Sequence, residues 1–115
     1  MGLLGKANAK SDTDIGIRAF ISSFHEKNPL FHCLLLRPQS GEKRGLLEIA
    51  AMSGSHGIKY TSLPNGDCLL LLPGDLDIGL FSHRISKSSG STVIMQFSAD
   101  SPSLAFEKLS ANNYQ

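Results

Sequence analysis

The spacing of hydrophobic residues switches between helical and strand-like patterns along this chain. After a polar segment at residues 11–14, apolar side chains recur at positions i, i+3, i+4 and i+7, as on one face of a helix. The residues of this stripe are Ile17, Phe20, Ile21 and Phe24. The helix is expected to end near Asn28 and Pro29. Residues 31–36 are then continuously apolar, which predicts a strand buried on both faces.

The remainder of the chain contains further segments of regular spacing. Residues 45–52 place Leu46, Ile49 and Ala50 on one helical face. Residues 92–98 alternate between apolar and polar side chains, as in a half-buried strand. The elements predicted after residue 36 are a helix at 45–52, strands at 58–62 and 68–72, a helix from Asp75 or Asp77 to about Lys87, a strand at 92–98 and a short helix at about 103–109.

The dipeptide Asn65-Gly66 is the most informative turn signal in the chain. It joins the mixed strand at residues 58–62 to the apolar strand at residues 68–72. Asn and Gly both tolerate the positive φ that a two-residue type I′ turn requires at its two central positions. We therefore predict a tight hairpin with this dipeptide at its tip.

The order of these elements predicts the fold class. A helix precedes a strand, helix, strand, strand, helix and strand, which is the split βαβ plan of the ferredoxin-like fold. We therefore expect an α+β domain in which a four-stranded antiparallel sheet of βαββαβ topology carries an additional N-terminal helix. In this plan the first and third strands are central. The continuous apolar runs at residues 31–36 and 68–72 suit those two positions, and the more polar strands suit the edges.

The third strand is apolar on both of its faces. Leu69 and Leu71 point to one face, while Cys68, Leu70 and Leu72 point to the other. The helices of the βαββαβ plan cover one face only, so the second face needs another layer. The N-terminal helix alone, or a second copy of the domain, would supply it.

Length and composition fit one compact cytoplasmic domain. The 115 residues allow a single domain at 11–115, preceded by a flexible tail at 1–10. A formal net charge of +1 gives no basic field for nucleic acid, and no apolar run approaches the roughly 20 residues of a membrane span. Cys33 and Cys68 lie in the two most apolar segments and are expected to be reduced core thiols, although neighbouring strands would also permit a disulfide.

Several of these segments together resemble the GGDEF domain, the diguanylate cyclase family with a ferredoxin-like palm. The helix at residues 45–50 looks like the family's helix after its first strand, and residues 65–73 are similar to its signature hairpin and the strand that follows. In active members of the family, carboxylates at the hairpin and at the end of the first strand hold divalent metal. The resemblance extends over roughly residues 15–109.

The residues that carry this chemistry are largely replaced. Asn65 stands at the first glycine position, Cys68 stands at the glutamate position, and the first strand ends in Arg37 rather than in an acid. Only Gly66 and Asp67 remain. The resemblance therefore implies a degenerate relative that is not an enzyme, with no catalytic residue, no metal site and no cofactor.

Two functions are consistent with this interpretation. The first is a non-catalytic regulatory or scaffolding module of a bacterial signalling protein, which acts through a protein partner or through self-association. The alternative is a sensor domain that binds a small molecule or a nucleotide at the hairpin. Its candidate ligand-binding residues are Arg37, Asn65, Gly66 and Asp67.

Overall fold

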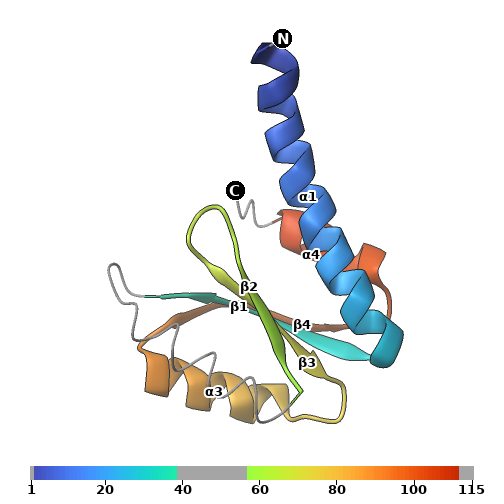
Figure 1. Ribbon diagram of the computed structural model, residues 1–115. Helices are drawn as coiled ribbons and strands as arrows, with labels where there is room; N and C mark the ends of the chain where they lie inside the picture. The colour runs from blue at the N-terminus through green and yellow to red at the C-terminus, as the bar shows by residue number, and fades with distance from the viewer. Residues whose placement is uncertain (1, 39–56, 112–115) are drawn as a thin grey trace.

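The computed structural model describes residues 2–38 and 57–111, and Figure 1 shows how their helices and strands are arranged. The predicted helix at residues 45–52 lies outside the described residues. The elements are α1 (Gly2–Lys27), β1 (Phe31–Arg37), β2 (Lys59–Ser62), β3 (Cys68–Pro73), α3 (Ile78–Ser89), β4 (Thr92–Ala99) and α4 (Pro102–Ala111). In the described part of the chain, no helix is long and apolar enough to cross a membrane.

The four strands form one antiparallel sheet in the order β2-β3-β1-β4. This confirms the α+β fold class, and it confirms that the two continuously apolar strands, β1 and β3, lie at the centre. Leu34 of β1 pairs with Leu70 of β3 on one side and with Gln96 of β4 on the other. The register between β1 and β4 shifts after Leu35, which leaves Ile94 as an extra, bulged residue in β4.

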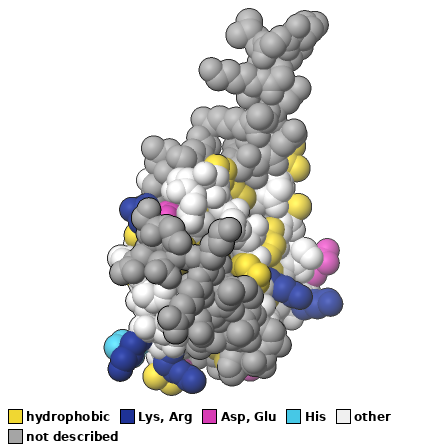
Figure 2. Space-filling view, turned by 60° about the vertical axis from the view of Figure 1, so that its left-hand side comes forward, with side chains coloured by type: hydrophobic (Ala, Val, Ile, Leu, Met, Phe, Trp, Pro, Cys, Tyr) yellow, Lys and Arg dark blue, Asp and Glu magenta, His cyan; other side chains and the backbone are white. Residues whose placement is uncertain are grey.

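Helices cover both faces of the sheet (Figure 1). On one face, α1 and α4 pack on the β1 and β3 side chains Cys33, Leu35, Leu69 and Leu71. On the other face, α3 places Phe81 and Ile85 against Leu34, Leu36, Cys68, Leu70 and Leu72. The second apolar face is thus covered within one chain, and α4 shares the task with α1. In Figure 2, the described hydrophobic side chains accordingly appear in small separate groups.

The helix α1 begins at Gly2, much earlier than the expected start near residue 11. Residues 2–10, which we expected to be a flexible tail, continue this helix beyond the sheet (Figure 1). Helix propagation explains the difference, because extending a helix already fixed by packing costs far less than nucleating a new one. The packing that fixes α1 comes from its second half, where Ile17, Ile21 and Phe24 are buried. The Arg18 guanidinium also lies 3.9 Å from the centroid of the Phe106 ring of α4.

The hairpin between β2 and β3 has a longer loop than the predicted two-residue turn. Leu63 N–H donates to the Asp67 carbonyl at 2.8 Å, and Gly66 N–H donates to the Leu63 carbonyl at 2.9 Å. These bonds enclose Pro64, Asn65 and Gly66 in a three-residue loop, which is typically a type I turn followed by a residue at positive φ. Gly66 takes that last position with φ of 92°. Pro64 is the physical reason, because its ring holds φ negative where a proline-led turn begins.

The helix α3 has the boundaries that its sequence predicts. The Asp77 carboxylate accepts a hydrogen bond from Leu80 N–H at 3.1 Å and caps the first turn. Gly90 ends the helix at φ of 70°, and its N–H donates to the Ser86 carbonyl. These caps fix the two ends of α3, and the helix buries Phe81 and Ile85 against the sheet.

We expect Gly66→Val to lower the free energy of unfolding by about 1 to 3 kcal/mol, because a β-branched residue is strained at positive φ. No heavy atom lies within 4 Å of a Cβ built on Gly66, so the cost would come from the backbone alone. Gly16 offers a matched control, since it is helical and equally open. Gly16→Ala should stabilise by about 0.5 to 1 kcal/mol, whereas Gly66→Ala should destabilise. Urea unfolding monitored by circular dichroism would show two shifts of the same sign if the hairpin assignment were wrong.

A second pair of variants tests whether α1 belongs to the core. The Ile21 side chain is 0% exposed and that of Ile15 is 62% exposed, although both lie in the same helix. Ile21→Ala should lower the free energy of unfolding by about 2 to 4 kcal/mol, because it leaves a cavity against the sheet. Ile15→Ala carries the same change in helix propensity and should stay within about 0.5 kcal/mol of the parent. Similar losses from both variants in denaturant melts would contradict the packing of α1 described above.

Candidate functional site

Arg37 and Asp67 form an ion pair between the two central strands. Leu36 is paired with Cys68, so the last residue of β1 lies opposite the residue that precedes β3. Arg37 Nε donates to Asp67 Oδ1 at 2.9 Å, and Arg37 Nη2 donates to Asp67 Oδ2 at 3.1 Å. This is the two-point geometry in which a guanidinium matches a carboxylate best. The pair therefore joins the end of the hairpin to β1.

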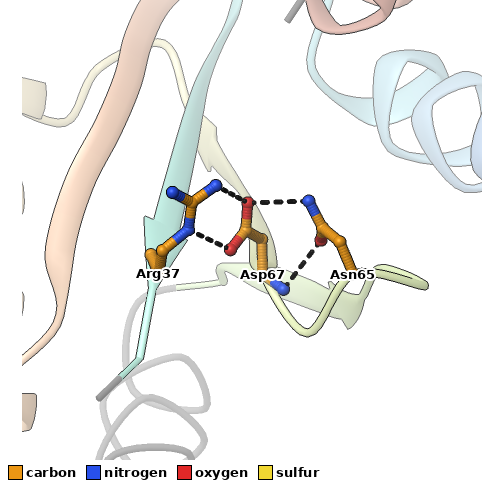
Figure 3. Close-up of polar contacts among 3 residues, drawn as sticks. All are labelled: Arg37, Asn65 and Asp67. Atoms are coloured by element: carbon orange, nitrogen blue, oxygen red, sulfur yellow. Dashed lines mark hydrogen bonds and ion pairs between the residues drawn. The ribbon is translucent and has the colours of Figure 1, made fainter. Parts of the chain in front are cut away.

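Asn65 completes the arrangement from the tip of the loop (Figure 3). Its Nδ2 donates to Asp67 Oδ2 at 3.1 Å, and its Oδ1 accepts the Asp67 backbone N–H at 2.9 Å. The Asn65 side chain thus bonds both the main chain and the side chain of a residue two positions later. Side-chain bonds of this kind stabilise turns without help from neighbouring elements. Asn65 acts here as a support for Asp67.

The two charges of the pair differ strongly in exposure. The Asp67 side chain is 3% exposed, whereas that of Arg37 is 59% exposed. The hydrogen bond to Asp67, and then its negative charge, raise the pKa of the Arg37 guanidinium, so the arginine stays charged. A carboxylate buried to this degree requires compensation by hydrogen bonds and an opposite charge. Arg37 and Asn65 supply both.

The four residues predicted as a ligand site are therefore close together but bonded to one another. Both Asp67 oxygens already accept hydrogen bonds from the chain itself, and Gly66 contributes the positive φ that the loop requires. Figure 3 shows one guanidinium nitrogen of Arg37 directed away from Asp67. That nitrogen offers a ligand one point of charge. The geometry favours a structural role for this cluster over ligand binding.

Within the described residues, no group of three or more His, Cys, Asp or Glu side chains is placed to hold a metal ion. Asp67 is the acidic residue of the hairpin, and its partner across the sheet is the cation Arg37. Mg²⁺ coordination at Asp67 would have to compete with this guanidinium for the same two oxygens.

The two cysteines are buried, free and on opposite faces of the sheet. Cys33 belongs to the core layer beneath α1 and α4, and Cys68 belongs to the layer beneath α3. Burial raises the pKa of the Cys33 thiol to about 12, against a small opposing effect of Lys108. Burial, assisted by the charge of Asp67, raises the pKa of the Cys68 thiol to about 12 as well. Since the thiolate is the reactive form, both side chains act as core residues.

Sequence reasoning assigned no role to two histidines that connect separate elements. His32 lies within β1, where its Nε2 donates to the Gly74 carbonyl at 3.2 Å and its Nδ1 is 2.7 Å from the Ser98 hydroxyl of β4. His25 Nε2, near the end of α1, is 2.9 Å from the Asp100 carbonyl. The position of His32 in an otherwise apolar run was the available signal, because a buried imidazole requires hydrogen-bond partners. Its partners are remote in sequence and could not be named.

Comparison of the chain with family models, with curated proteins and with solved structures finds no match in any of the three. The resemblance to the GGDEF domain consequently stays a prediction that rests on the residues quoted for it.

We predict that Asp67→Ala lowers the free energy of unfolding by about 2 to 3 kcal/mol, because it removes an acceptor of charge-assisted hydrogen bonds and leaves Asn65 Nδ2 unpaired. Asp75→Ala removes the same group from an exposed position of the β3–α3 turn and should change stability by less than about 0.5 kcal/mol. Thermal and urea unfolding of both variants provide the measurement. If Asp67→Ala proved as stable as Asp75→Ala, the ion pair would have no structural role.

Proposed function

We propose that this chain is a non-catalytic regulatory or scaffolding module that acts through protein contacts, and that β4 is the strand through which it contacts a second copy of itself. The observation that supports the proposal is the character of this edge strand. β4 (Thr92–Ala99) contains no charged residue, no proline and no glycine. Within the described residues it pairs on one side only, with β1.

The opposite edge of the sheet differs in each of these respects. β2 is four residues long, carries the charged side chain of Lys59, and lies between Gly57 and Pro64. Short length, lysine and proline are the features by which natural edge strands avoid pairing with other chains. β4 has eight residues, and the bulge at Ile94 is its one feature that discourages pairing with another chain. The contrast favours β4 as the edge that accepts a partner strand.

Among the described residues, helices pack on both faces of the sheet beside β4, and no strand pairs with its outer edge. α3 and α4 both contact β4 from opposite sides of the sheet, and Lys108 Nζ of α4 lies 5.0 Å from the centroid of the Phe97 ring. An incoming strand would therefore meet backbone N–H and C=O groups between two ordered layers. Antiparallel pairing of β4 with β4 of a second copy obeys two-fold symmetry and continues the sheet from one copy into the next.

The setting of this module in a bacterial signalling protein is inferred from the GGDEF resemblance alone. A sensor function at Arg37, Asn65, Gly66 and Asp67 has less support, because Asp67 is bonded to Arg37 and Asn65. Contact with other proteins needs no such site. It requires a surface whose backbone groups can form hydrogen bonds with a partner, and the edge strand β4 provides one.

Sedimentation equilibrium of the full chain across the micromolar range tests the proposal. We expect reversible dimerisation, and we expect Gln96→Lys to weaken it by about tenfold or more, because two-fold pairing would bring like charges close together across the new strand pair. Gln96 is exposed, so the variant should fold normally. Ser88→Lys places the same charge on the exposed side of α3 and is the matched control. A parent chain that stays monomeric, or equal weakening by Ser88→Lys, would contradict contact through β4.

A further inference from the structure

A groove of about 340 Å³ lies between the second half of α1 and the start of β2. Residues from α1 form one wall, and Gly57 and Lys59 form the other. The sheet register explains its position. Lys59 pairs with Leu71, whose side chain belongs to the core layer beneath α1, so the Lys59 side chain lies on the same face of the sheet as α1. α1 packs over β3, whereas β2 is the edge strand next to it. The groove lies at this edge, between α1 and the start of β2.

The groove combines an apolar wall with positive charge. Phe20 and Phe24, one helical turn apart, line it and also pack against the core. Lys27 and Lys59 also line the groove, and its lining among residues 2–38 and 57–111 includes no acidic residue. Neither lysine forms an ion pair with a carboxylate of the described residues. The side-chain amide of Asn28 is already used, since its Nδ2 donates to the Phe24 carbonyl at 3.0 Å.

We propose that this groove binds a small carboxylate that has an apolar, preferably aromatic, body. Its volume is near the lower limit of small-molecule sites, which are about 300 to 1,000 Å³ and mostly apolar with a few placed polar groups. The two phenylalanine rings suit an aromatic or aliphatic body, and the two lysines suit an anionic head. Lys27 and Lys59 have no carboxylate partner among the described residues, and like charges beside one small space repel each other, so an anion between them relieves that repulsion as well as gaining contacts.

This inference is independent of the association through β4, because the groove lies at the β2 edge of the sheet and β4 forms the opposite edge. Ligand binding in the groove and dimerisation are therefore expected to be separable. A variant that loses one property should retain the other.

The test is a titration of the full chain followed by amide chemical shifts in NMR spectra. Three probes separate the contributions: phenylpropionate, its uncharged analogue phenylpropanol, and acetate. We expect phenylpropionate to shift the amides of Phe24, Lys27, Gly57 and Lys59 in a saturable way. We expect phenylpropanol to bind about tenfold more weakly and acetate to give no saturable shift, because charge and apolar contact are both required.

Variants of the two lysines assign the charge contribution. Lys27→Gln and Lys59→Gln should each weaken phenylpropionate binding by about twofold to fivefold, the range expected for an exposed ion pair. Lys87→Gln, on the exposed side of α3, removes the same charge elsewhere and should leave binding unchanged. The proposal is overturned if phenylpropanol binds as tightly as phenylpropionate, if acetate or inorganic phosphate alone reproduces the shifts, or if the shifts do not centre on the groove.

Discussion

Burial of both faces of β1 and β3 is the constraint from which the rest of the architecture follows. Residues 31–36 and 68–72 are all buried, and their side chains alternate between two separate core layers. Covering a leucine fully is worth about 1.5 to 3 kcal/mol, so leaving either face open would forfeit much of the stability of a domain this small. Two layers of helix are therefore needed. α1 and α4 form one layer, and α3 contributes to the other, which explains why an element outside the βαββαβ plan is integral to the fold.

This constraint also determines where the molecule can bind anything else. Since both faces are covered by helices, the sheet itself offers other molecules only its edges and the gaps between helix and edge. The two edges differ in chemistry, because β4 is long and uncharged, whereas β2 is short and carries Lys59. Backbone pairing with a partner strand suits β4. A small ligand with a charged head suits the groove beside β2, where a lysine and an aromatic wall meet.

The fold was largely predictable because its elements are signalled locally. Largely apolar runs marked β1 and β3 as central, and Asp77 and Gly90 lie where α3 begins and ends. The loop type was missed although Pro64 stands directly before Asn65, because attention to the dipeptide alone ignores the φ that proline fixes. The pairing of Arg37 with Asp67 depends on strand register, and register follows from how the whole sheet assembles. No local pattern could have shown that these candidate ligand residues satisfy one another, or that Lys27 and Lys59 share a groove.

The ion pair of Arg37 and Asp67 attaches the hairpin to the central strand β1. A buried carboxylate requires a positive charge nearby, and β1 supplies it through Arg37. In the GGDEF domains that the sequence resembles, an acid that helps to bind metal would stand at this position. The Arg37 guanidinium thus compensates the charge of Asp67, as a bound metal ion would, and it also fixes the loop to the central strand β1. Because β2 begins the same hairpin, this attachment also restrains the edge that carries Lys59. A groove with one wall on α1 and the other on β2 discriminates between ligands better when both walls are held in place, and the ion pair contributes by holding the hairpin to β1.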